Sequence, residues 1–153
     1  MLVHATCVDL AGAGILILGP SGAGKSDLAL RLIADGAFLV GDDQVLLRQD
    51  GGVLLARGPE TIGGLVEVRG SGILPAPCKL ATVLRLAVQL SDVPPARLPE
   101  PCWWQPPGAG LPRLPLLMLD GREASAAAKV RITLAGLFHG GGVSLPEPHA
   151  FGR

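Results

Sequence analysis

Short apolar runs separated by glycine-rich turns dominate the first part of the chain. Residues 2–10 alternate loosely and are rich in strand formers, residues 11–14 have turn composition, and residues 15–18 form a short apolar run. Residues 27–34 are made almost wholly of good helix formers, and Gly36 supplies a C-terminal stop. This pattern predicts a strand hairpin followed directly by a helix.

The rest of the pattern predicts further strands and one more helix. In chain order these are a buried strand at 37–40, a hairpin of 45–48 with 53–56, a short strand around Glu67, an alternating strand at 79–90, a buried strand at 116–119 and an amphipathic helix at 123–139. The prolines of residues 91–115 leave no regular element there. We therefore expect one α/β domain over residues 1–142, with a mixed β-sheet, hairpins and a few helices, and a flexible tail at 143–153.

The turn between the strand at 15–18 and its helix fits the phosphate-binding pattern G-x-x-x-x-G-K-[ST]. Its glycines let backbone N–H groups form a nest for phosphate oxygens, and the helix N-terminus adds partial positive charge. Lys25 would reach the β- and γ-phosphates, and the Ser26 hydroxyl would bind Mg²⁺. An accidental glycine-rich turn is the weaker alternative because both flanks suit the motif. We predict a nucleotide site made by Gly19, Pro20, Ser21, Gly22, Ala23, Gly24, Lys25 and Ser26.

Two adjacent carboxylates follow the strand at 37–40. Strand, loop, helix and strand form a crossover unit, so we expect the strands at 15–18 and 37–40 to be parallel and adjacent. Asp42 and Asp43 would then emerge at the phosphate-loop end of the sheet, where such folds bind ligands. Carboxylates suit both a nucleotide-bound Mg²⁺ and the proton of a hydroxyl nucleophile, and neighbouring side chains leave a strand on opposite faces. An acidic pair that only caps a turn is the alternative, and the nearby phosphate loop favours function.

His4 is placed by the register of the predicted N-terminal hairpin. With a four-residue loop Leu10 faces Ile15, and the same ladder brings His4 opposite Ser21 in the phosphate loop. The residues alone leave a structural histidine equally open. Glu67 and Arg69, two positions apart, point to one face, which suits a metal or phosphate site and an edge-strand ion pair alike.

Composition narrows the possible partners. The 153 residues carry a net charge of zero, which gives no electrostatic basis for binding nucleic acid or an anionic membrane. No apolar run reaches the length of a membrane span, and no basic residue precedes the N-terminal apolar part as in a signal peptide. Three cysteines without a C-x-x-C pair are typical of reduced thiols in a cytoplasmic protein. For Trp103-Trp104 we favour a role in covering the core over one in partner docking.

Three signals now stand in a fixed order: the phosphate loop, an Asp-Asp pair 17 and 18 positions after Lys25, and Glu67-Val68-Arg69-Gly70. This arrangement resembles the catalytic domain of HPr kinase/phosphorylase, the bifunctional enzyme that acts on a serine of the phosphocarrier protein HPr. The similarity runs from Val3-His4 to Gly72-Ile73 and covers about the first half of the chain. It implies the P-loop fold shared by HPr kinase and PEP carboxykinase, in the short form that consists of the catalytic domain only.

The resemblance also implies roles for individual residues. ATP would bind at the phosphate loop with Lys25 on its phosphates, and Ser26 would hold Mg²⁺ with help from Glu67. Asp43 would be the base that takes the serine proton and returns it during phosphorolysis. Asp42 would support the metal or its waters, and His4 would orient the acidic site. The family further implies an HPr-type protein substrate and a homo-oligomer, a hexamer in the family.

Four departures from the family pattern bear on these roles. Ser71 replaces an apolar residue of the signature segment, Gly41 stands where Ala is common, and Arg97 matches a functional arginine only weakly. The Pro- and Arg-bearing loop that the family uses for dephosphorylation has no clean counterpart between Leu114 and Arg122. The kinase direction is therefore better supported than the phosphorylase direction. A small-molecule P-loop kinase and a non-catalytic nucleotide-binding regulatory module are the alternatives.

Overall fold

The computed structural model describes residues 1–59, 64–68, 70–108 and 110–140, and leaves the side chains of Glu67 and of residues 138–140 undescribed. The predicted tail at 143–153 and Arg69 lie outside these residues. The elements are β1 (Leu2–His4), β2 (Thr6–Leu10), β3 (Ala13–Leu18), α1 (Lys25–Ala34), β4 (Phe38–Gly41), β5 (Gln44–Asp50), β6 (Val53–Arg57), β7 (Leu65–Val68), β8 (Gly72–Pro75), β9 (Ala81–Leu90), β10 (Trp103–Trp104), β11 (Leu114–Leu119) and α2 (Ala126–Gly140). The predicted mixed α/β architecture with hairpins and few helices is confirmed.

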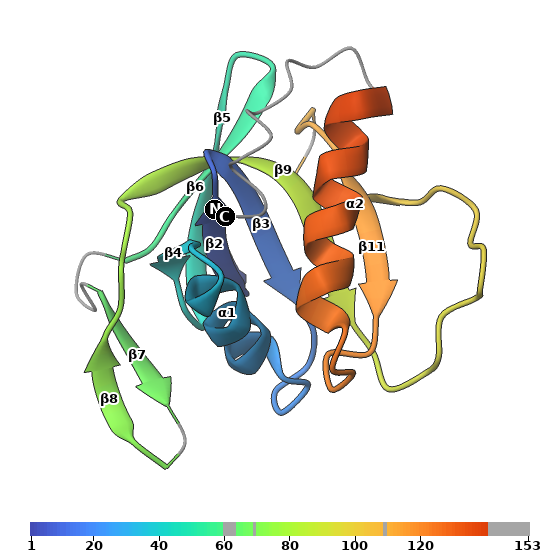
Figure 1. Ribbon diagram of the computed structural model, residues 1–153. Helices are drawn as coiled ribbons and strands as arrows, with labels where there is room; N and C mark the ends of the chain where they lie inside the picture. Colours follow the sequence, from blue (N-terminus) through green and yellow to red (C-terminus); the bar gives the residue numbers. More distant parts are fainter. Residues whose placement is uncertain (60–63, 69, 109, 141–153) are drawn as a thin grey trace.

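A curled mixed sheet organises these elements (Figure 1). Its order is β1-β5-β6-β9-β3-β2-β4, with β11 beside β9 and β10 beside β11. The pairs β3–β9 and β9–β11 are parallel, and the other pairs in the sheet are antiparallel. The β7–β8 hairpin forms a separate two-stranded sheet that stands away from the main one.

The crossover from β3 to β4 differs from the prediction in one respect. Both strands pair antiparallel with β2, so they are parallel to each other as expected. They are not adjacent, because β2 lies between them and takes the hydrogen-bonding edge of each. The preceding hairpin therefore supplies the strand that separates β3 from β4.

The register of the β2–β3 hairpin is also corrected. Leu10 pairs with Ala13 and Val8 with Ile15, because the turn has two residues instead of four. Ala11 (φ 55°) and Gly12 (φ 87°) both adopt the left-handed conformation that a tight two-residue hairpin requires. The ladder ends at Thr6, and β1 pairs instead with β5, so His4 lies opposite Gln44 and not opposite Ser21.

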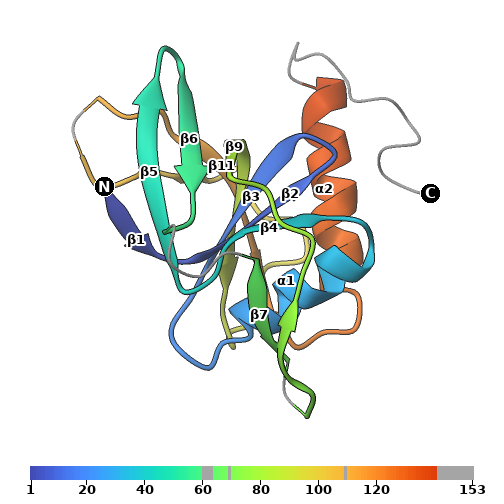
Figure 2. The same ribbon diagram turned by 90° about the vertical axis from the view of Figure 1, so that its left-hand side faces the viewer.

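Two hydrophobic clusters sandwich the centre of the sheet, and strand alternation decides which residues enter each. Ile15 and Ile17 of β3 pack with Leu28 and Leu32 of α1 and with Leu134 of α2. The intervening side chains of β3 face a second cluster, which the β5–β6 hairpin covers from the other side. Figure 2 shows both helices on one side of the sheet and this hairpin on the opposite side. Burial on both faces explains the continuous apolar run of β3.

The second half of the chain follows its predicted order. The alternation in β9 is confirmed from Thr82 onward, with Thr82, Leu84, Leu86, Val88 and Leu90 all buried. The strand begins at Ala81, so Leu80, which was expected on the same buried face, lies before it and is exposed. The expectation of no regular element over residues 91–115 is correct for residues 91–102 and wrong beyond them, because Trp103–Trp104 form β10, which pairs with the start of β11. Of the two tryptophans, Trp104 packs on the second cluster, while Trp103 is half exposed with the Arg113 guanidinium 4.1 Å from its ring centroid. Among the described residues, no helix is both long enough and apolar enough to cross a membrane.

Candidate phosphate-binding site

The phosphate loop has the backbone geometry that its glycines predict. Gly22 (φ 83°) and Gly24 (φ 99°) adopt left-handed conformations that strain other residues, and Gly24 is the N-cap of α1. Within the described part of the chain no side chain makes a capping hydrogen bond to this helix end. Its first N–H groups and its dipole can therefore serve an anion.

Lys25 lies inside the loop. It is buried, and its Nζ donates hydrogen bonds to the carbonyl oxygens of Gly19 (2.7 Å) and Pro20 (3.0 Å). The Lys25 ammonium and the helix N-terminus together concentrate positive potential at the loop. The site is thus suited to several phosphate charges in a row.

Asp42 joins three elements at the mouth of this loop. Its Oδ1 accepts hydrogen bonds from Ser26 Oγ at 2.8 Å and from Thr6 Oγ1 at 3.0 Å. Ser26 comes from the first turn of α1, and Thr6 is the fully buried first residue of β2. The predicted convergence of Ser26 and Asp42 is confirmed, and Thr6 is an addition that the sequence did not signal.

The arrangement of oxygens around Ser26 fits a magnesium ion. Mg²⁺ is commonly bound by one or two protein oxygens together with waters and substrate phosphates, and a hydroxyl beside a carboxylate supplies such oxygens. Among the described residues no group of three His, Cys, Asp or Glu side chains gathers, so a site made wholly of protein ligands is not indicated there. Glu67 lies on β7 opposite Ile73, and its side chain is outside the description.

Asp43 contacts His4, which is not one of the partners of Asp42. The distance from His4 Nε2 to Asp43 Oδ1 is 2.6 Å, with the side chains 51% and 73% exposed, respectively. Asp43 has a φ of 69°, and its carbonyl oxygen accepts the N–H of Ala5 at 3.2 Å. An Asp in this conformation at an exposed turn is strained, which marks it as a functional candidate. His4 therefore reaches the site, although by pairing of β1 with β5 and not by the predicted ladder.

Gly41, just before the acidic pair, has a steric reason to lack a side chain. A Cβ there would lie 2.9 Å from the Gln44 carbonyl oxygen and 3.2 Å from Cα of Gly58. Two backbones approach each other directly at this point. The position where the similar family commonly has Ala is therefore filled in this chain by a residue that the packing requires.

A cavity of about 480 Å³ adjoins the phosphate loop on the side of β9 and β11. Its lining includes residues 20–23 of the loop, Ser91 at the end of β9, and Asp120 and Arg122 after β11. The backbone N–H of Arg122 is the main cause that lowers the pKa of Asp120 below its usual value, and the Arg122 guanidinium adds to it. Asp120 is therefore ionised at neutral pH.

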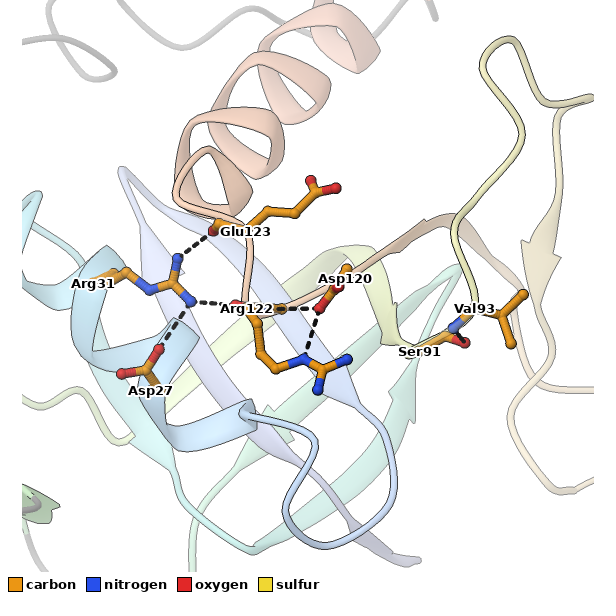
Figure 3. Close-up of polar contacts among 8 residues, drawn as sticks. Asp27, Arg31, Ser91, Val93, Asp120, Arg122 and Glu123 are labelled. Carbon is orange, nitrogen blue, oxygen red and sulfur yellow. Dashed lines mark hydrogen bonds and ion pairs between the residues drawn. The ribbon is translucent and has the colours of Figure 1, made fainter.

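Figure 3 shows how the turn after β11 is held. Arg31 of α1 donates to the carbonyl oxygens of Gly121 and Glu123 and to Asp27. Sequence reasoning missed Arg31, Asp120 and Arg122. For Asp120 and Arg122, a turn that follows a buried strand parallel to β3 was an available signal, because the carboxyl ends of parallel strands share one sheet edge. Arg97 is exposed and is not among the residues that line this cavity.

Comparisons with known proteins agree with this geometry. The family described as "HPr Serine kinase C-terminal domain" matches residues 1–78. An HPr kinase/phosphorylase of Geobacillus sp. (strain WCH70) is 52% identical over 73 residues, which are 47% of this chain and 24% of that protein. One of Clostridium acetobutylicum is 47% identical over 75 residues, 49% of this chain and 25% of that protein. The matched segment thus spans about a quarter of these relatives.

A solved structure shows the same fold over nearly the whole chain. It is titled "Structure of the Hpr(Ser) kinase/phosphatase from Coxiella burnetii" and superposes with a TM-score of 0.73. The similarity covers 91% of this chain and 90% of that one at 24% sequence identity. The fold likeness therefore extends through the second half, which the sequence matches do not reach.

Proposed function

The chain belongs to the HPr serine kinase C-terminal domain family, and from that premise we propose that it is an ATP-dependent kinase for a serine of an HPr-type phosphocarrier protein. One observation carries the proposal: two adjacent carboxylates divide their contacts between the phosphate loop and the solvent. Asp42 bonds to the loop residue Ser26, while Asp43 is exposed beside His4. A serine on the surface of another protein can approach such an exposed carboxylate.

The contacts of the two carboxylates support different roles. Asp42 Oδ1 already accepts hydrogen bonds from Ser26 and Thr6, so this oxygen is less available to an incoming hydroxyl. Asp43 has His4 on Oδ1 and is largely exposed, so its second oxygen can accept the proton of an incoming hydroxyl. We assign Asp43 as the base, His4 as the group that orients it, and Asp42 as a support for the metal or its waters.

Magnesium would be held by Ser26, with Asp42 close by and Glu67 as a further ligand carried over from the family. Bound there, Mg²⁺ supplies neutralising charge for the phosphates. Lys25 and the N–H groups of residues 19–26 bind and orient the triphosphate. In the transfer, the serine oxygen forms a bond to the γ-phosphorus as the bond to the β-phosphate oxygen breaks. The serine proton passes to Asp43, and ADP leaves.

The direct test is phosphorylation of HPr with Mg-ATP, followed by detection of acid-stable phosphoserine. We expect Asp43→Asn to reduce transfer by about 10²–10⁴-fold, the usual contribution of a general base, and to keep nucleotide binding. Asp50→Asn, which changes an exposed Asp at the end of β5, is the matched control and should transfer normally. Normal transfer by Asp43→Asn would contradict the assignment. Nucleotide binding without any transfer by the unaltered chain would support a regulatory module instead.

The proposal extends to the reverse reaction, the assembly and the compartment. Incubating phosphorylated HPr with inorganic phosphate should release pyrophosphate if Asp43 also returns the proton to serine. We further propose a cytoplasmic homo-oligomer, a hexamer as in the family, which light scattering of the purified chain tests. A monomer at micromolar concentration would contradict the proposed homo-oligomer and leave the proposed reaction untouched.

A further inference from the structure

We propose that Arg31 is a positioning residue that holds the turn of residues 120–123 against the phosphate loop, so that Arg122 and the loop form one pocket for the phosphate groups of the nucleotide. The inference rests on the proposed nucleotide-dependent function and refines it. Arg31 lies on the side of α1 that faces the turn after β11, as Figure 3 shows.

The contacts of Arg31 define the path of the turn. Nη1 donates to the Glu123 carbonyl oxygen at 2.9 Å, while Nη2 donates to the Gly121 carbonyl oxygen and to Asp27 Oδ2, the latter at 2.9 Å. Two of these three acceptors are backbone atoms on either side of Arg122. A planar guanidinium with a fixed fork of donors therefore sets the geometry of the backbone from which Arg122 projects.

The turn reaches the phosphate loop by close packing. A Cβ on Gly121 would lie 2.9 Å from Leu90 Cδ1 and 3.2 Å from the carbonyl oxygen of Ala23. Gly19 of the loop packs on Leu90 in the same way, with its ideal Cβ position 3.2 Å from Leu90 Cβ. The turn and the loop thus both pack on the side chain of Leu90, and together they form one wall of the cavity. A displacement of the turn would open this wall.

The charge of Arg122 makes this wall suitable for binding a phosphate group. Arg122 is 69% exposed, and its Nε lies 3.3 Å from Asp120 Oδ1. An exposed ion pair of this kind is weak because water screens it. A phosphate group in the adjoining cavity offers a more strongly charged acceptor, so the guanidinium can turn to it at little cost. Arg122 then adds a second cation, besides Lys25, to the proposed phosphate site, provided that the turn keeps its place.

The test is a double-mutant cycle on Mg-ADP affinity, measured by titration calorimetry of the full chain. Arg122→Ala and Arg31→Ala should each weaken binding by about tenfold, as expected for a lost charge-assisted hydrogen bond. The double variant should be no weaker than Arg122→Ala, because Arg31 acts only through Arg122. If the losses of Mg-ADP affinity of the two single variants multiply in the double variant, the inference is overturned, because Arg31 then acts independently of Arg122. Arg31→Lys, which keeps the charge but not the fork, is measured in the same cycle should the alanine variant not fold, and we expect an intermediate loss.

Arg131→Ala is the matched control. Arg131 of α2 forms an ion pair at 3.7 Å with Asp35, the C-cap residue of α1, and it is 27% exposed against 28% for Arg31. It does not contact the turn, so its loss should leave the Mg-ADP affinity within about twofold whatever it does to stability. An equal loss of affinity in Arg131→Ala would overturn the inference. If the unaltered chain does not bind Mg-ADP, the proposed function fails and the inference with it; if it binds and the cycle is additive, only the inference fails.

Discussion

The contact between Gly41 and Gly58 leads to a quantitative prediction about stability. Alanine at position 41 would bring its Cβ to 2.9 Å from a backbone oxygen of Gln44 and to 3.2 Å from Cα of Gly58. Both atoms belong to the main chain and cannot move away by rotating a side chain. Overpacking of this kind costs about 1–3 kcal/mol, and we expect about 2 kcal/mol for Gly41→Ala.

Two further glycines, Gly58 and Gly52, provide comparisons for the loss of stability expected at position 41. Alanine at position 58 would bring its Cβ closer to the Val40 carbonyl oxygen than either contact made at position 41, so its cost should reach or exceed about 3 kcal/mol. At Gly52, in the β5–β6 turn, no atom lies within 4 Å of the added Cβ and φ is not left-handed. Gly52→Ala should therefore be neutral or stabilise the fold by up to about 1 kcal/mol, because it restricts the unfolded chain.

Urea denaturation measures all three free energies of unfolding, with a common slope as the sign that the denatured state is unchanged. The expected order of stability is Gly52→Ala, then Gly41→Ala, then Gly58→Ala. Because Asp42 follows directly on Gly41, the alanine variant should also lower the affinity for Mg-ADP. Gly41→Ala with a stability within about 0.5 kcal/mol of Gly52→Ala would refute the reasoning.

Three more predictions follow from buried groups. Lys25→Met should lower Mg-ADP affinity by at least about tenfold in calorimetric titration, because a charge within the phosphate loop is lost; unchanged affinity would contradict the role of the loop. Thr6→Val should reduce the free energy of unfolding by about 1 kcal/mol in urea because Asp42 loses a buried hydroxyl donor, and an unchanged free energy would contradict this reasoning. Burial raises the pKa of the Cys7 thiol, while Cys78 is exposed. Iodoacetamide should therefore modify Cys78 in the native protein and Cys7 only after unfolding, as peptide mass spectrometry can show; equal rates would contradict this.

Elements that depend on local rules were predictable from the sequence. The phosphate loop and α1 follow from glycine positions, helix formers and a stop signal within about twenty residues. His4 was predicted near the site, but through a register that proved wrong. A four-residue loop seemed natural for residues 11–14, whereas the chain turns on Ala11 and Gly12. The apolar pattern does not distinguish a two-residue turn from a four-residue turn here. Alanine rarely adopts a positive φ, so the sequence gives no reason to expect a tight turn on Ala11.

Contacts between distant segments were not predictable. Arg31 reads as an ordinary exposed helix residue, yet it binds carbonyl oxygens 90 and 92 positions away. Carbonyl acceptors carry no sequence signature, so no pattern of residue types could reveal this pairing. The same holds for the approach of Gly41 to Gly58, which depends on how β4 and the end of β6 meet in space.

The position of β2 explains both why β3 and β4 are not adjacent, contrary to the prediction, and why His4 still lies near the acidic residues. Because β2 runs antiparallel to both β3 and β4, its first residue lies at the sheet edge where those two strands end. That edge carries the phosphate loop after β3 and Asp42 after β4, and Thr6 therefore meets Asp42 there. The chain just before β2 must pass the same edge, and this brings His4 to Asp43. With β3 and β4 adjacent, as the crossover pattern predicted, the amino end of β2 would lie outside the pair, and neither N-terminal side chain would have this route to the acidic residues.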